Sequence, residues 1–196
     1  MAKRGYHHGN LRDALIEATL TLIVAKGPQG FTLAQAARQA GVTPAAIYRH
    51  FAGRDDLIAE TARQGYVLFA AMLSEVADTP GAPRVRAMAR AYLAFAERHP
   101  GHYIAMFESG IDLARRPALA EAATRARDLL HAACDGLGCD AEEVTAHVWS
   151  LSHGVVELYL RNSAGLSHPP VARATLSRAV DTYLSGLAAP ASHSKR

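Results

Sequence analysis

Cysteine is scarce in this 196-residue chain, which contains only Cys134 and Cys139. Two thiols are too few for a disulfide framework or for a zinc site made of four cysteines. They flank a glycine-containing turn, and no basic residue adjoins them to activate a thiolate. We therefore expect inert thiols rather than a redox pair.

Long uncharged stretches are also absent. The two longest, residues 144–156 and 182–194, contain 13 residues each, whereas a membrane-spanning helix needs about 20. The basic start of the chain, residues 1–8, is not followed by the apolar segment of a signal peptide. The sequence thus predicts a cytoplasmic protein that does not contact the membrane.

Strand-favouring residues are few as well. Valine and isoleucine together number 17, whereas alanine alone numbers 40. Because alanine favours helices and β-branched residues favour strands, this balance predicts an all-α protein. The sequence also has no glycine-rich phosphate loop, no Gly-x-Ser-x-Gly motif and no cluster of metal ligands. We expect neither an enzyme nor a bound cofactor or metal ion.

Charge is unevenly distributed along the chain, although the net charge is only +3. Residues 1–54 contain seven basic and two acidic side chains, whereas residues 55–196 contain 14 basic and 16 acidic ones. A basic N-terminal segment on a slightly acidic body indicates that this segment meets an anion such as nucleic acid. Chance clustering of charge is the alternative at this point.

Helical periodicity and helix-ending residues predict about nine helices. The clearest breaks are Gly27-Pro28 and the segments 79–83, 99–101 and 136–138. The expected helices cover residues 10–26, 33–40, 44–50, 54–78, 84–98, 103–107, 117–135, 141–162 and a last segment that begins at Pro169.

The strongest functional signal lies between Thr32 and Leu57. Two short helices, each preceded by a threonine cap, are joined at Gly41, whose missing side chain suits a tight helix exit. The alanines at positions 36, 37 and 40 would let the helices cross closely. The second helix begins with small residues that can enter a DNA major groove. This arrangement is typical of a helix-turn-helix.

This segment resembles the DNA-binding head of the TetR family of transcriptional regulators. The residues that carry the resemblance are Thr32, Ala40-Gly41-Val42-Thr43, Ile47-Tyr48-Arg49-His50-Phe51, Arg54 and Leu57. The helix expected over residues 10–27 matches the family's first helix, and Arg54 stands where lysine is more common. The resemblance implies a helix-turn-helix DNA-binding domain over residues 1–54 and a ligand-binding and dimerisation domain over residues 55–196.

Particular side chains of this head are expected to contact DNA. The candidates are Thr43, Pro44, Ala45, Ala46 and Arg49 for base edges, Thr32, Arg38, Tyr48, His50 and Arg54 for phosphates, and Lys3 and Arg4 as an N-terminal arm. The resemblance implies the phosphate role of Tyr48, His50 and Arg54. The alternatives are packing for the tyrosine, surface charge for Arg54, and a solvated tail in place of the arm.

A second resemblance covers the rest of the chain. Trp149-Ser-Leu-Ser-His153-Gly154 is similar to the Trp-His-Gly signature of one C-terminal subgroup of the TetR family. The segment 103–107 and the start at residues 7–12 fit the same subgroup. The resemblance implies a homodimer paired through the last two helices, and two apolar stripes on the expected helix 141–162 support it. Two heads would bind a near-palindromic operator with half-sites about 34–36 Å apart or a multiple of that.

An effector pocket is expected among the helices of the C-terminal part, mainly apolar, with His153 as its best polar contact. The candidate residues, most of which would be plain core, are Tyr66, Phe69, Met72, Tyr92, Phe95, Tyr103, Met106, Phe107, Trp149 and His153. The predicted function is a repressor released from its operator by a small effector. An activator of the same family and a helical small-molecule carrier are the alternatives.

Overall fold

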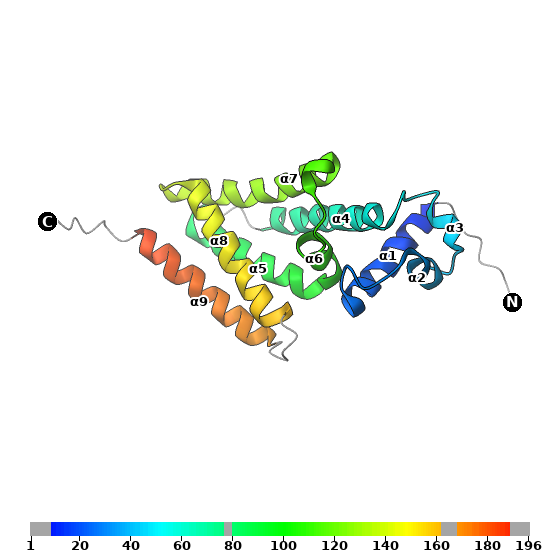
Figure 1. Ribbon diagram of the computed structural model, residues 1–196. Helices are drawn as coiled ribbons and strands as arrows, with labels where there is room; N and C mark the ends of the chain where they lie inside the picture. Colours follow the sequence, from blue (N-terminus) through cyan, green and yellow to red (C-terminus); the bar gives the residue numbers. More distant parts are fainter. Residues whose placement is uncertain (1–8, 77–79, 162–167, 189–196) are drawn as a thin grey trace. The chain divides into compact units, whose positions relative to one another are not determined.

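The computed structural model describes residues 9–76, 80–161 and 168–188, and over these residues it is helical without a strand. Its α-helices, in chain order, are α1 (Gly9–Lys26), α2 (Leu33–Gln39), α3 (Pro44–Ile47), α4 (Arg54–Ser74), α5 (Ala82–Arg98), α6 (Pro100–Phe107), α7 (Pro117–Cys134), α8 (Ala141–Val156) and α9 (Pro169–Ala188) (Figure 1). Short 3-10 helices cover Leu113–Arg115 and Asp135–Leu137, and a π-helical segment covers Glu157–Arg161. The predicted all-α fold with about nine helices is confirmed over the described residues.

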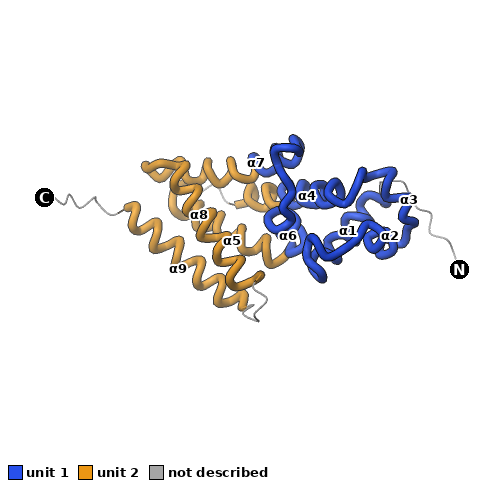
Figure 2. Tube along the Cα trace, in the orientation of Figure 1, with its two compact units in different colours: residues 1–68, 99–124 blue, residues 69–98, 125–196 orange. Residues whose placement is uncertain are grey.

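The chain forms two compact units (Figure 2). Unit 1 comprises Met1–Leu68 and His99–Thr124, and unit 2 comprises Phe69–Arg98 and Arg125–Arg196. Both α4 and α7 therefore belong in part to each unit. The boundary predicted after residue 54 divides the chain by function, whereas these two units divide it by packing. The functional boundary stays a prediction.

The core of unit 1 is built around α1. Its residues Leu15, Ile16 and Ile23 are at most 1% exposed, and the helix packs against α2 and α6. Gly101 makes the approach of α6 possible, because a side chain there would meet the backbone oxygen of Leu20 at 3.0 Å. Burial of these aliphatic side chains, each worth about 1.5–3 kcal/mol, stabilises the unit.

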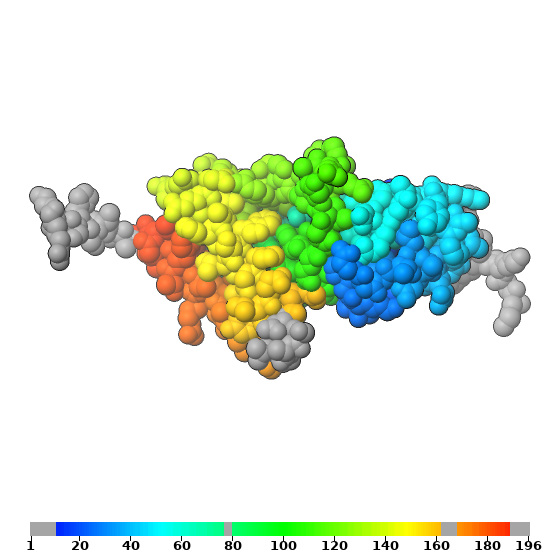
Figure 3. Space-filling view, viewed as in Figure 1, coloured from blue at the N-terminus to red at the C-terminus, as the bar shows by residue number. Residues whose placement is uncertain are grey.

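The core of unit 2 lies between α5, α8 and α9, which all contact one another. Buried residues recur on α9 at every fourth position, from Ala172 to Leu184, so that one face of the helix is apolar. Two ion pairs join α5 to α9 at the surface: Arg86 with Asp181 at 2.5 Å and Arg173 with Glu97 at 2.9 Å. Figure 3 shows α8 (yellow) and α9 (orange to red) side by side.

Helix ends differ from the predicted ones where local hydrogen bonds compete with the helix. α4 ends at Ser74 rather than at residue 78, and the Ser74 hydroxyl donates to the carbonyl of Ala71 at 2.8 Å, a contact that weakens a helix end. α8 changes into a π-helical turn at Glu157, which a 3.6-residue periodicity does not reveal.

Each of the two apolar stripes of α8 is partly buried within unit 2, while Leu158, at the end of the first stripe, is 59% exposed. Val148 and Val155 of one stripe are buried, but so are Ser152 and Val156 of the other, because α8 packs against both α5 and α9.

None of the helices in the described part of the chain has the length and apolar character that a membrane span requires.

Candidate nucleic-acid interface and effector site

The first helix of the helix-turn-helix is fixed by a capping box. The hydroxyl of Thr32 accepts a hydrogen bond from the backbone N–H of Gln35 at 3.2 Å, and the Gln35 side chain accepts one from the N–H of Thr32 at 3.0 Å. These two bonds satisfy donors that would otherwise be unpaired at the start of α2. Ala36 and Ala37 behind them are fully buried, as their small size predicts for a close helix crossing.

The turn after α2 has the predicted geometry. Gly41 lies in the left-handed region with φ +72°, a conformation that residues with a side chain rarely adopt. The N–H of Val42 then reaches back to the carbonyl of Ala37 at 2.9 Å. Thr43 occupies the cap position of α3, yet its hydroxyl makes no capping hydrogen bond.

The second helix is shorter than predicted. α3 ends at Ile47 rather than at residue 50, because the N–H groups of Arg49 and His50 bond to carbonyls three residues back, at 3.3 and 2.8 Å. These tighter turns are typical of a helix end. Ile47 is fully buried and Phe51 is 2% exposed, so both ends of the turn are anchored in the core of unit 1.

Most of the predicted DNA contacts in the described part of the head reach the surface. Tyr48 is 63% exposed, which excludes the alternative that it is a packing residue. The other exposed candidates are Thr32, Arg38, Thr43, Pro44, Ala45 and Arg49, whereas Ala46, His50 and Arg54 are half-buried. Lys3 and Arg4 lie outside the described residues.

Arg54 faces the interior of the head rather than open solvent. Its Nη2 donates a hydrogen bond to the carbonyl oxygen of Pro28, and its guanidinium lies over the ring of Phe31, 5.2 Å from the centroid. Its Nη1 is 3.5 Å from the carboxylate of Asp55. In this structure the residue joins the start of α4 to the loop before α2, and its phosphate contact stays a prediction.

Five of the ten predicted effector residues form an aromatic cluster in unit 2, consisting of Phe69, Tyr92, Phe95, Trp149 and His153. The ring of Phe69 lies 5.2 Å from Tyr92, 5.0 Å from Phe95 and 6.2 Å from Trp149. The hydroxyl of Tyr92 and Nδ1 of His153 share a hydrogen bond of 3.0 Å. The space between Phe69, Tyr92 and Trp149 does not admit a water molecule, so these three rings pack without a cavity between them.

Four of the remaining predicted residues belong to unit 1. Tyr66, Tyr103, Met106 and Phe107 lie in unit 1, where the Phe107 ring is 5.8 Å from Tyr66 and 4.8 Å from Tyr103. Burial raises the pKa of Tyr66 to about 12, as expected for a phenol within a core. Met72 is half-buried on α4. The predicted effector residues therefore fall in both units, and their role stays a prediction.

The two cysteines lie in unit 2, Cys134 buried and Cys139 exposed. Burial raises the pKa of the Cys134 thiol, which disfavours the reactive thiolate. Among the residues that the structure describes, no three histidine, cysteine, aspartate or glutamate side chains are grouped to hold a metal ion. The inert reading of the cysteines stays a prediction.

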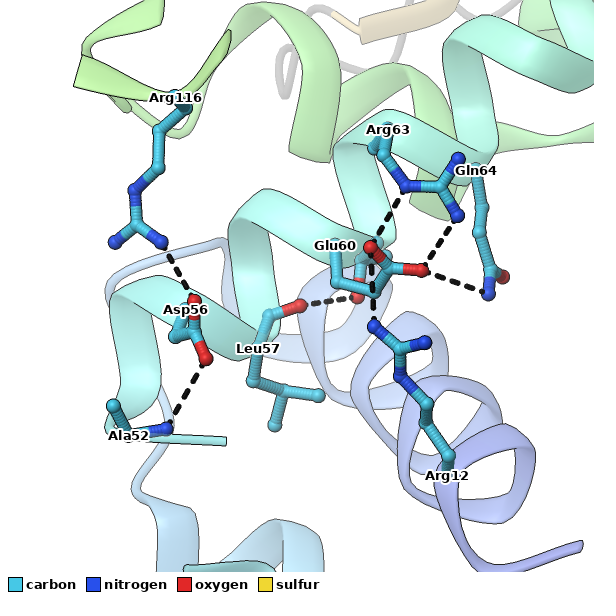
Figure 4. Close-up of polar contacts among 9 residues, drawn as sticks. Arg12, Ala52, Asp56, Leu57, Glu60, Arg63, Gln64 and Arg116 are labelled. Atoms are coloured by element: carbon cyan, nitrogen blue, oxygen red, sulfur yellow. Dashed lines mark hydrogen bonds and ion pairs between the residues drawn. The ribbon is translucent and has the colours of Figure 1, made fainter. Parts of the chain in front are cut away.

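A group of charged side chains in unit 1, centred on the first turns of α4, was not predicted from the sequence (Figure 4). Glu60 accepts two hydrogen bonds from Arg63 at 2.8 Å and lies 3.3 Å from Nη2 of Arg12. One turn earlier, Asp56 accepts a hydrogen bond from Arg116 at 2.7 Å. The hydrogen bonds from Arg63 hold the pKa of Glu60 below its usual value. One feature of the sequence could have indicated this group: Asp56 and Glu60 are four residues apart, which places both carboxylates on one face of the helix.

Two family models match the chain. The model for bacterial regulatory proteins of the tetR family matches residues 15–61, and the model for a tetracyclin repressor-like C-terminal domain matches residues 85–183. The second match alone covers half of the chain. Neither match singles out the Trp-His-Gly subgroup, which stays a prediction.

Individual relatives agree with this result. An uncharacterized HTH-type transcriptional regulator, YobS of Bacillus subtilis (strain 168), is 29% identical over 96 residues, which are 48% of this chain and 50% of that protein. The chain therefore matches about half the length of this curated relative. A solved protein of unknown function from Rhodococcus sp. RHA1 is 26% identical with a TM-score of 0.77, covering 95% of this chain and all of that one.

Two further solved structures share the fold. A regulatory protein in the tetR family from Rhodococcus RHA1 is 17% identical with a TM-score of 0.72, covering 90% of this chain and 96% of that one. The regulator FadR from Bacillus subtilis, solved with stearoyl-CoA, is 15% identical with a TM-score of 0.70, covering 86% and 97%. Together with the two matched domains and the helix-turn-helix geometry, these findings show that the chain belongs to the tetR family of bacterial regulatory proteins.

Proposed function

We propose that the protein is a repressor that binds a near-palindromic operator as a dimer and is released by a small, mainly apolar effector. The observation that carries this proposal is the exposed surface of α3 and the turn after it. Residues 43–45, Tyr48 and Arg49 are exposed there, whereas Ile47 beneath them is fully buried. Small side chains, a phenol and a guanidinium held on a rigid support suit a major groove.

Dimerisation through α8 and α9 is part of the proposal. Because part of each α8 stripe is buried within unit 2, the support comes from apolar side chains that remain at the surface. Leu158, Val171 and Leu187, which follow α8 or lie on α9, are 59%, 47% and 40% exposed. Pairing with a second copy of the chain would remove these apolar side chains from water, which is favourable. A second copy of the chain would place two heads on successive half-sites.

The effector site of the proposal is the aromatic cluster of unit 2. Its rings offer an apolar environment, and the hydrogen bond between Tyr92 and His153 supplies one polar contact. Because no cavity lies between Phe69, Tyr92 and Trp149, an effector must separate these rings to enter between them. The solved complex of FadR with stearoyl-CoA, a ligand with a long apolar chain, supports an apolar effector by similarity of fold.

α4 is the element that can transmit this opening to the head. It is one continuous helix from Arg54, which contacts the loop before α2, to the segment that carries Phe69 in the cluster. An effector that displaces Phe69 would therefore favour a different position of α4, and this would change the spacing between the two heads of the dimer. The proposed functional division, DNA binding over residues 1–54 and effector binding over residues 55–196, follows from this.

The direction of regulation and a carrier role are the competing functions. An activator would bind its operator more tightly, or equally well, with effector present. A carrier would bind the effector and show no preference among DNA sequences. Both alternatives can be distinguished from a repressor in one titration.

The experiment starts with selection of a binding sequence from random DNA by the purified protein. Operator affinity is then measured by fluorescence anisotropy while candidate apolar effectors are added. Because Trp149 is the only tryptophan of the chain, its fluorescence reports entry into the cluster. We expect effectors that change this signal to lower operator affinity about 5–150-fold. A changed tryptophan signal with unchanged operator affinity would contradict the proposal.

A pair of variants separates the two activities. Arg49→Ala should weaken operator binding and leave the response of Trp149 to effector unchanged. Arg90→Ala removes an exposed arginine of α5 and serves as the matched control, with both activities retained. Equal loss of operator binding in the two variants would show that general positive charge, rather than the α3 surface, binds the DNA.

A further inference from the structure

An Arg-lined cleft of about 230 Å³ lies within unit 1. Its charged lining residues are Arg12, Asp56, Glu60, Arg63, Arg115 and Arg116. The buried side chains of Phe51 and Leu119 supply apolar surface in the same cleft. None of the residues predicted to contact DNA or effector belongs to this lining.

The lining carries more positive than negative charge. Glu60 is shared by two arginines, Arg12 at 3.3 Å and Arg63 at 2.8 Å. Asp56 is bound by Arg116, which approaches from the other side of the carboxylate pair (Figure 4). Two carboxylates therefore face four guanidinium groups, which leaves a surplus of two positive charges in the lining.

Arg115 is the least constrained of the four arginines. Its side chain is 86% exposed, and its ion pair is with Asp112 at 3.3 Å, which is outside the lining. Even with Asp112 counted, one positive charge remains unbalanced. A guanidinium that is held only at the surface can turn toward an anion that enters the cleft.

The start of α7 adds a second feature that favours an anion. The first three residues of this 18-residue helix, Pro117 to Leu119, line the cleft. The N-terminal end of a helix carries partial positive charge. Here it acts through this charge, because Pro117 has no N–H and that of Leu119 bonds to the carbonyl of Arg116 at 3.0 Å. No acidic residue lies in the first turn of α7 to neutralise this end.

We propose that the Arg-lined cleft binds a small molecule that carries a phosphate group. Guanidinium groups bind phosphate oxygens in pairs, through the planar arrangement of their N–H donors. The volume of the cleft is below the roughly 300–1,000 Å³ of sites for drug-sized ligands, which limits the ligand to a compact phosphomonoester. The proposal goes beyond the proposed regulatory function and does not depend on it.

The test is calorimetric titration of the full chain, without DNA, with inorganic phosphate and with glycerol 3-phosphate. Ionic strength is kept constant with chloride, because exposed charges are screened by salt. We expect saturable binding at one site per chain. Arg115→Gln should weaken it about tenfold, the effect of losing a hydrogen bond to a charged group.

The matched control is Arg125→Gln, which removes an exposed arginine of α7 outside the lining and should leave binding unchanged. Arg12→Gln provides a second variant in the cleft, with circular dichroism as the check that the fold is retained. Absence of saturation, or equal weakening by Arg115→Gln and Arg125→Gln, would overturn the proposal.

DNA is the other source of phosphate that these arginines could bind. A separate titration with unselected double-stranded DNA distinguishes the two sources. If Arg115→Gln weakens DNA binding while neither phosphate probe binds the unmodified protein, the cleft contacts the DNA backbone and the small-molecule proposal is wrong. If both phosphate probes bind and DNA affinity is unchanged, the proposal holds.

Discussion

Thr32 and Thr43 each precede a helix of the head, but only one of the two side chains makes a capping hydrogen bond. The hydroxyl of Thr32 accepts the N–H of Gln35 at 3.2 Å, whereas the hydroxyl of Thr43 makes no capping bond. Both side chains are exposed, so neither contributes buried surface. We predict that Thr32→Ala destabilises the head and that Thr43→Ala hardly changes its stability.

The magnitude follows from the capping box of Thr32. Loss of such a cap destabilises a protein by about 1 kcal/mol. With a urea dependence of about 2 kcal/mol per molar, the midpoint of unfolding should fall by about 0.5 M. Hydrogen exchange of the Gln35 amide should become about fivefold faster, since 1.4 kcal/mol corresponds to a factor of ten. For Thr43→Ala we expect less than about 0.5 kcal/mol.

Hydrogen exchange at single amides and urea unfolding are the two assays. Thr32→Ser keeps a hydroxyl at the cap and should restore the stability of the unmodified protein. Thr43→Ala should instead weaken binding to selected operator DNA, because its hydroxyl remains available for a base edge or phosphate. Equal destabilisation by the two alanine variants would refute the reasoning, as would an unchanged Gln35 exchange rate in Thr32→Ala.

Three other predictions concern the turn, the pH dependence and the DNA contact. Gly41→Ala should destabilise the protein by about 1–2 kcal/mol in thermal unfolding, because φ is +72° at this position; an unchanged transition would contradict this. Burial, together with the nearby His99, lowers the pKa of His102 to about 4, so the unfolded chain binds a proton near pH 6.5 that the folded chain does not. Stability should therefore fall as pH decreases from about 6.5 to 4, and His102→Gln should reduce this fall; identical pH profiles would contradict it. Arg49→Ala should lower the salt dependence of operator binding by about one unit of slope if the side chain contacts phosphate, or relax base preference at one position if it contacts a base.

The helix-turn-helix could be predicted in detail because its signals are local. A threonine cap, a glycine at a left-handed position and small alanines at a crossing each determine the structure of their own neighbourhood. The capping box at Thr32, the φ of Gly41 and the burial of Ala36 and Ala37 all agree with the sequence. The predicted end of α3 was wrong by three residues, because the N–H groups of Arg49 and His50 bond to carbonyls three residues back rather than four.

The effector residues were harder to predict because aromatic side chains at helical spacing give no information on their partners. Phe69 and Tyr66 are three residues apart on α4, yet Tyr66 contacts the ring of Phe107 in unit 1, whereas Phe69 contacts the ring of Tyr92 in unit 2. Likewise, positive charge at Arg54 does not reveal that its guanidinium bonds to Pro28. The charged group around Glu60 joins residues up to 60 positions apart, a distance in sequence that no local pattern spans.

The most direct test of the regulatory account is the salt dependence of binding to selected operator DNA, measured by anisotropy for the unmodified protein and for Arg49→Ala. The account predicts two protomers, or a multiple of two, per site and a steep linear decrease of log affinity with log salt. It also predicts that the affinity for selected DNA exceeds that for scrambled DNA by a factor of about 10³ or more. Arg49→Ala should clearly lower the affinity for selected DNA. Equal affinity for selected and scrambled DNA, or an unchanged affinity in Arg49→Ala, would contradict it.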